Sequence, residues 1–256
     1  MTAPIPRDIP DLPAIPRTHA LLPSFVPASA VVTPVRRPLT GALRLLIAGT
    51  AAGAVTLALL LGSPPRVLSH FSVQSTILLA LVTLVSARRA WTARRPLPSA
   101  LTGAALLYAV INGLVYHLLL ADTATPFSVT GTTGAPTGWH ALAHHLLHTV
   151  IPAAALLDWL LLTAPGHLHL RQAATWLVYP LTYLAFFLTR AALINTGVPD
   201  RYFYPFLDAA AHGYKHILAN ALLLGLSVYA LAVLLVALDH ARPNPVPHRT
   251  KTGFRL

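Results

Sequence analysis

Residues 217–238 read ILANALLLGLSVYALAVLLVAL, a stretch of 22 residues without a charged side chain. A helix needs about 20 mostly apolar residues to cross the hydrocarbon core of a bilayer, so this stretch predicts a membrane span. The whole chain of 256 residues agrees, because 55% of them are hydrophobic, only 10% are charged and the mean hydropathy is +0.63. A soluble domain carries about 25% charged residues. We therefore expect an all-α integral membrane protein.

Five further apolar stretches bring the number of predicted transmembrane helices to six, in one domain over residues 39–240. No internal repeat typical of secondary transporters is evident. Residues 1–38 hold nine prolines and no apolar run, which predicts a disordered cytoplasmic tail and no signal peptide. Residues 241–256 are predicted to be a basic cytoplasmic tail. The predicted spans are Leu39–Leu61, Phe71–Ala87 (the shortest), Ser99–Leu120, Trp139–Thr163, Ala174–Asn195 and Ala209–Leu238.

Basic residues gather in alternate connections between the predicted spans. Arg88, Arg89, Arg94 and Arg95 follow the second span, whereas the connection 122–138 holds no Lys or Arg. Short cytoplasmic loops carry the excess of Lys and Arg, so both termini are expected in the cytoplasm, as in a multi-pass protein of the cell membrane, here a bacterial inner membrane. The net charge of +11 favours anionic membrane lipids as partners. No nucleic acid is expected, because the basic residues are scattered at helix ends.

Polar residues on five predicted helices fall at one level of the membrane. At a rise of about 1.5 Å per residue, they lie about 24 to 28 Å above the cytoplasmic boundary. Polar groups in hydrocarbon are costly and mark functional sites, so we expect a cavity that opens toward the outer leaflet and admits a lipid-like substrate sideways. The residues at this level are Ser72, Tyr116, His148, Arg190 and Asn220, with Asn112 about one turn deeper.

Four histidines stand within nine residues at the start of the fourth span. Three of them, His140, His144 and His148, recur at intervals of four and share one helix face, while His145 points elsewhere. His148 is the deepest, and Pro152 has no N–H to give to its carbonyl, so a kink is expected there. His148 is the histidine that we expect to act as a base.

The expected chemical partner of this base is a hydroxyl group, because the chain has no Cys and no Glu. A neutral His can take a proton from Ser or Thr and return it to a leaving group. Ser72 is preferred because it matches the depth of His148 and lies in the first turn of its helix, where free N–H groups favour an oxyanion. A simple capping or packing role for Ser72 is the alternative. The other candidates are Ser75, Thr76 and Thr149.

Four short motifs occur in a distinctive order. They are Phe71-Ser72-Val73-Gln74-Ser75, then His148-Thr149-Val150-Ile151-Pro152 followed by Leu157-Asp158-Trp159, then Tyr204-Pro205-Phe206-Leu207-Asp208, and His212-Gly213-Tyr214. From Leu39 to about His240 the chain resembles the bacterial six-span membrane proteins of the Pr-six-Pr family. These are similar in turn to the eukaryotic androgen-induced and androgen-dependent TFPI-regulating proteins.

The resemblance implies an activity and a pair of catalytic residues. The eukaryotic proteins are membrane hydrolases of fatty-acid esters of hydroxy fatty acids, with a Thr nucleophile and a His. Carried over by motif, the Thr position falls on Ser72 and the His position on His148. The eukaryotic His stands one residue further from its Pro, which places Leu147 at the ungapped position and makes His144 the fallback. The Tyr204–Asp208 segment implies a loop over the outer mouth, with Asp208 as an orienting acid.

The function that we expect is intramembrane hydrolysis of lipid esters. Ser72 would attack the ester carbonyl, His148 would act as base and then as acid, and Arg190 would hold a carboxylate of the substrate. No cofactor is needed for this chemistry. The supporting or substrate-binding residues predicted beside the catalytic pair are Gln74, Asn112, Tyr116, His144, Arg190, Asp208, His212, His216 and Asn220.

Two other functions are open. His212, His216 and Asn220 recur at intervals of four, so two pairs of His on two helices could supply four imidazoles to one metal ion or to a haem. The pairs are His144 with His148 and His212 with His216. A transporter or a lipid-binding protein without catalysis would present the same cavity, and turnover distinguishes it from a hydrolase.

Overall fold

The computed structural model describes residues 35–121, 127–132, 134–195 and 201–244, apart from the side chains of residues 209–212 and 214. Every regular element in these ranges is a helix, and six helices are long and apolar enough to cross a membrane. The predicted all-α class is therefore confirmed for the described residues, as is the prediction of six helices long and apolar enough to span a membrane. The six apolar helices are Pro38–Leu61, Phe71–Trp91, Ser99–Leu120, Gly138–Leu162, Leu170–Leu193 and Lys215–Ala241.

Several of these spans are built from more than one helical segment. The elements are α2 (Pro38–Leu61), α3 (Pro64–Leu68), α4 (Phe71–Trp91), α5 (Ser99–Val115) with the π-helical turn η1 (Tyr116–Leu120), α6 (Gly138–His145) with the π-helical turn η2 (Leu146–Val150), α7 (Ile151–Leu162), α8 (Leu170–Trp176), α9 (Val178–Leu193), the 3-10 turn η3 (Pro205–Leu207) and α10 (Ala209–Ala241).

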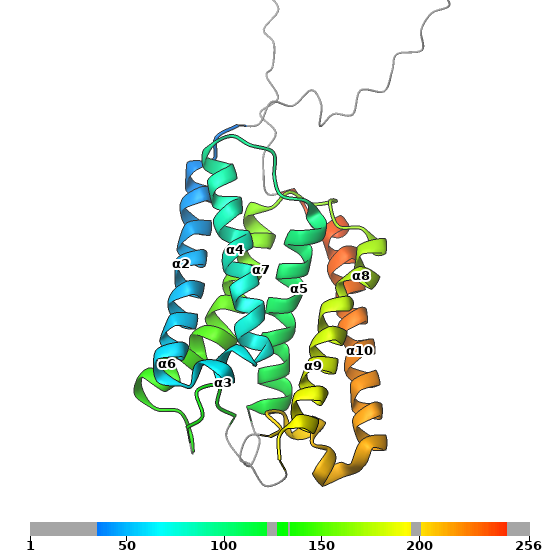
Figure 1. Cartoon of the computed structure of the whole chain (residues 1–256). Coiled ribbons are helices and arrows are strands. Elements are labelled where there is room, and N and C mark those ends of the chain that lie inside the picture. The colour runs from blue at the N-terminus through cyan, green and yellow to red at the C-terminus, as the bar shows by residue number, and fades with distance from the viewer. Residues whose placement is uncertain (1–34, 122–126, 133, 196–200, 245–256) are drawn as a thin grey trace, which may run out of the picture. The chain divides into compact units, whose positions relative to one another are not determined.

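Helices that follow one another along the chain pack in antiparallel pairs (Figure 1). α2 packs along α4, α4 on α5, α5 on α7, and α10 on α8. Small buried residues of α2 let it approach α4 closely, as is usual between membrane helices. The start of α2, the end of α4 and the end of α10 lie at one end of the bundle (Figure 1). We call this the basic end, because its described arginines include Arg36, Arg37, Arg88, Arg89, Arg94, Arg95, Arg171 and Arg242.

Three of the predicted spans differ from the structure by three residues or more. The fifth begins at Leu170, four residues before Ala174. The second span is not short, since α4 has 21 residues and runs four residues beyond Ala87 to Trp91; its terminal arginines extend toward water. The sixth span does not run unbroken from Ala209, because the backbone at Gly213 has φ +74° and ψ 161°. Glycine adopts this conformation at little cost. The break removes the helical spacing between His212 and His216.

The fourth span contains a π-helical turn, η2, just before Pro152. In η2 the N–H of Ile151 bonds the carbonyl of Leu146, five residues back, so the next carbonyl, that of Leu147, would need an N–H from Pro152. The side-chain Nδ2 of Asn112 donates to this carbonyl at 2.8 Å. The carbonyl that receives the substitute donor is thus that of Leu147 and not that of His148.

One turn earlier on α5, a second side chain donates to a carbonyl that a proline leaves without its helical N–H. Pro180 has no N–H for the carbonyl of Trp176, and the hydroxyl of Tyr108 donates to that carbonyl at 2.8 Å. Tyr108 and Asn112 are four residues apart on α5 and share one face. α5 therefore completes the backbone hydrogen bonding of both proline-interrupted spans and fixes their position around it.

Two ion pairs among the described residues, Arg44 with Asp158 and Arg242 with Asp239, lie toward the basic end of the helices. Arg44 Nε donates to Asp158 at 2.8 Å. The Asp239 carboxylate accepts the backbone N–H groups of residues 167 and 168 and an N–H of Arg242 at 2.9 Å. Paired charges are tolerated inside apolar surroundings far better than single ones.

Candidate functional site

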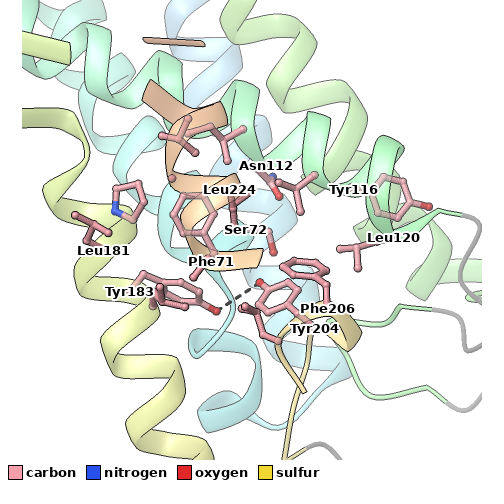
Figure 2. Close-up of a pocket in the computed structure, with 18 of the residues that line it drawn as sticks. Phe71, Ser72, Asn112, Tyr116, Leu120, Leu181, Tyr183, Tyr204, Phe206 and Leu224 are labelled. Carbon is pink, nitrogen blue, oxygen red and sulfur yellow. Dashed lines mark hydrogen bonds between the residues drawn. The ribbon is translucent and has the colours of Figure 1, made fainter. Parts of the chain in front are cut away.

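A cavity lies between α4, α5, α9, α10 and the turns η1, η2 and η3. It holds about 820 Å³ of space between atoms, part of it open to the outside. Aliphatic and aromatic side chains form most of its wall, and Figure 2 shows them around Ser72. The polar residues among the described lining are Ser72, Asn112, Tyr116, His148, Tyr183 and Tyr204.

Ser72 presents a buried hydroxyl to this cavity. It is the second residue of α4 and is 3% exposed, and its Oγ has no hydrogen-bond partner among the described residues. The N–H groups of a first helical turn also have no carbonyl partner within their own helix. A buried hydroxyl without a partner costs about 1–3 kcal/mol, so a ligand or water is expected to bond it.

The hydrogen bonding of His148 leaves one ring nitrogen for the cavity. His148 is 2% exposed, and its Nδ1 lies 2.9 Å from the carbonyl oxygen of His144. A carbonyl only accepts, so Nδ1 carries the proton and Nε2 holds a lone pair. The ring lies against Tyr116, with the ring centres 4.8 Å apart. His148 thus has the tautomer that a general base needs.

The backbone around His148 is held from α5. Asn112 bonds the carbonyl of Leu147, and α5 approaches so closely at Gly113 that a Cβ there would lie 3.1 Å from Pro152 and 3.4 Å from the carbonyl of His148. The proline, the amide and the glycine together set the position of the imidazole relative to α5.

Two tyrosines line the side of the cavity toward η3. The hydroxyl of Tyr183 donates to the carbonyl of Ser69 at 2.9 Å and lies 3.4 Å from the hydroxyl of Tyr204 (Figure 2). Tyr183 has one proton, so Tyr204 is the donor in the pair. Burial raises the pKa of Tyr204, which keeps this hydroxyl protonated.

The sequence alone does not indicate either tyrosine as a site residue. Tyr204 belongs to the Tyr204–Asp208 motif, but the resemblance implies a role only for Asp208 in that motif. Tyr183 could be found only by its position on α9. It lies next to Leu184 and three residues after Pro180, and these two residues share the helix face that lines the cavity.

The other predicted residues whose side chains the structure describes are not among the described lining residues of the cavity. Gln74 links two helices, since it accepts from the Tyr179 hydroxyl at 3.0 Å and donates to the carbonyl of Leu68. His144 packs its ring on Tyr116, with the centres 4.6 Å apart.

Two of the predicted residues, Arg190 and Asn220, bond backbone carbonyls of the connection before α10. The guanidinium of Arg190 stacks over Phe203 at 4.2 Å and donates to a backbone carbonyl. Asn220 donates to the carbonyl of Phe206 at 2.8 Å. Asp208 is half-buried and His216 is exposed. The side chain of His212 lies outside the described residues.

The part of the chain that the structure describes contains no assembled metal site. No three side chains of His, Cys, Asp or Glu gather there closely enough to hold an ion. The predicted four-imidazole group also includes His212, whose side chain is outside this part, and the break at Gly213 separates it from His216.

Comparison with known proteins gives no match, whether with family models, with curated proteins or with solved structures. The resemblance to the Pr-six-Pr proteins therefore rests on the four motifs. Independently of it, a hydroxyl and an imidazole acceptor that border one apolar cavity are the groups that acyl transfer on an apolar substrate requires.

Proposed function

We propose that this chain is a multi-pass membrane protein that hydrolyses lipid esters in the cavity between α4, α5, α9 and α10. The observation that carries the proposal is the shared cavity of Ser72 and His148. One contributes a buried hydroxyl that lacks a partner in the described structure, and the other an unprotonated nitrogen. The basic end is proposed to face the cytoplasm, and the side of the cavity toward η3 is proposed to be its mouth, which then faces the outer leaflet.

The reaction begins with transfer of a proton from Ser72 to Nε2 of His148. The Ser72 oxygen bonds the ester carbonyl carbon, and the tetrahedral intermediate collapses as the bond to the alcohol oxygen breaks. The imidazolium gives its proton to the departing alcohol. Water then attacks the acyl-serine with His148 again as base, releasing the fatty acid and restoring the hydroxyl.

The start of α4 offers groups that stabilise the negative charge of the intermediate. The N–H of Ser72 lies in the first turn, where the helix dipole is positive. Donors placed in advance within a site that excludes water contribute strongly to such reactions.

The proposed substrates are esters in which at least one chain is long and apolar. The described cavity wall offers six polar residues against fifteen apolar ones, so it binds hydrocarbon better than a polar headgroup. The motif resemblance adds fatty-acid esters of hydroxy fatty acids as the first substrates to examine.

Turnover of a fluorogenic long-chain ester by the purified protein in detergent tests this proposal. We expect Ser72→Ala and His148→Ala each to lower kcat by about 10²- to 10⁴-fold. Ser75→Ala is the matched control for loss of a buried α4 hydroxyl, because Ser75 is equally buried and does not line the cavity. Its Oγ bonds the backbone carbonyl of Ser72, and the Ser72 hydroxyl is left in place by this substitution. An unchanged rate in Ser72→Ala would overturn the nucleophile, and binding without any turnover would indicate a lipid-binding protein instead.

A further inference from the structure

We propose that the part of the cavity beside α10 holds one extended acyl chain of the substrate, and that Gly225 sets how long a chain it accepts. This inference rests on the proposed function, because it assigns the two halves of the ester to two parts of the cavity that meet at Ser72.

The part beside α10, which we call the acyl arm, has an aliphatic wall. α10 contributes Ala221, Leu224, Gly225 and Val228, whose spacing of three and four residues places them on one helix face. Opposite them, the segment from Leu177 to Leu184 adds further aliphatic side chains. A wall of this kind, with no polar group from α10, favours a saturated hydrocarbon chain.

The other part of the cavity has a different character. Around the mouth the wall is aromatic, with Phe127, Tyr204 and Phe206. Figure 2 shows Leu224 on one side of Ser72, and Tyr204 and Phe206 on the other. The acyl chain is therefore assigned to the acyl arm, and the alcohol that leaves is assigned to the mouth, where it can depart.

The absence of a side chain at Gly225 widens the acyl arm and does not serve close packing between two helices. A Cβ built at Gly225 meets no atom within 4 Å, whereas a Cβ at Gly103 would lie 2.5 Å from Trp176 and one at Gly113 would lie 3.1 Å from Pro152. Glycine weakens a helix relative to alanine, and close packing does not explain it here. The space that its missing side chain leaves belongs to the cavity.

The acyl arm also has an end. From Ala221 to Val228 the wall extends about 10 Å along α10. Val228 lies at that end and is only 5% exposed. A larger side chain at Gly225, about midway, would shorten the arm and exclude the distal methylenes of a long chain while leaving room for a short one.

The test compares Gly225→Leu with Gly53→Leu. Gly53 is also helical, in α2, its added Cβ also meets nothing within 4 Å, and it does not line the cavity. Each substitution is made in the full chain in two backgrounds. With Ser72 present, kcat/KM is measured for a fluorogenic ester series from butyrate to palmitate. In Ser72→Ala, displacement of a fluorescent fatty acid by fatty acids of the same series is measured.

In both assays we expect Gly225→Leu to shift the preferred chain length downward, by on the order of tenfold in affinity for every two methylenes that no longer fit. Gly225→Ala, a smaller change, should shift it less, and Gly53→Leu should leave the profile unchanged. An unchanged profile in Gly225→Leu would overturn the acyl arm even if esters are hydrolysed. A shifted binding profile without hydrolysis would keep the arm and reject the hydrolase.

Discussion

At the scale of single residues, one hydrogen bond separates the roles of two neighbouring histidines. The Nδ1 of His148 donates to the backbone carbonyl of His144. The two rings also pack with their centres 4.4 Å apart, so the side chain of His144 contributes packing but not the hydrogen bond. The imidazole of His148 lines the cavity, and that of His144 does not.

His144→Ala should therefore keep most of the esterase activity, because the carbonyl that orients His148 remains. His148→Ala should lower kcat by about 10²- to 10⁴-fold. The measurement is kcat of both purified variants with one long-chain ester. Loss of activity in His144→Ala with retention in His148→Ala would identify His144 as the base.

The amide of Asn112 compensates for the N–H that Pro152 lacks, and a double-mutant cycle measures this. Asn112→Leu should lower the free energy of unfolding by about 1–3 kcal/mol, because it leaves the buried carbonyl of Leu147 without a donor. In a Pro152→Ala background the backbone N–H is restored, so the same change should cost less. Thermal unfolding in detergent gives the values. Equal costs in both backgrounds would show that the two residues act independently.

At the scale of elements, α5 organises the helices around the cavity. It supplies the donors at Tyr108 and Asn112 and approaches its neighbours closely at Gly103 and Gly113. Several contacts at once therefore fix the position of α5. The neighbouring helices cannot easily shift to accommodate a larger side chain on it.

Gly103→Ala should destabilise the protein by about 1–3 kcal/mol, because the added Cβ would lie 2.5 Å from the ring of Trp176. Gly49→Ala in α2, where a Cβ meets nothing within 4 Å, should be neutral or stabilising by up to about 1 kcal/mol. Both are measured as shifts of the unfolding midpoint in the same detergent. A neutral Gly103→Ala would mean that α5 and α8 are packed less tightly than described.

Sequence alone predicts the six spans because hydropathy and length fix them, but it predicts the site incompletely. Counting residues gives the depth of a side chain and not the rotation of its helix. Ser72, His148 and Arg190 share one predicted depth, but of these three only Ser72 and His148 are among the described residues that line the cavity, whereas Arg190 stacks on Phe203. The break at Gly213 and the π-helical turn before Pro152 likewise depend on tertiary contacts that no periodicity shows.

At the scale of the whole molecule, the proposed orientation can be measured directly because the chain has no cysteine. Thr92→Cys places a thiol at the basic end, and Ala135→Cys places one in the connection before α6; both positions are exposed. In intact cells a membrane-impermeant maleimide should label only Ala135→Cys. After permeabilisation it should label both. Labelling of Thr92→Cys alone in intact cells would reverse the orientation.

The central claim is that Ser72 is a nucleophile activated within the cavity. A lipophilic fluorophosphonate reacts with such a serine, and peptide mass spectrometry locates the adduct. We predict an adduct on Ser72 in the wild type and in Ser75→Ala, much slower labelling in His148→Ala, and none in Ser72→Ala. An unlabelled wild type, or equal labelling of Ser72→Ala, would contradict the account.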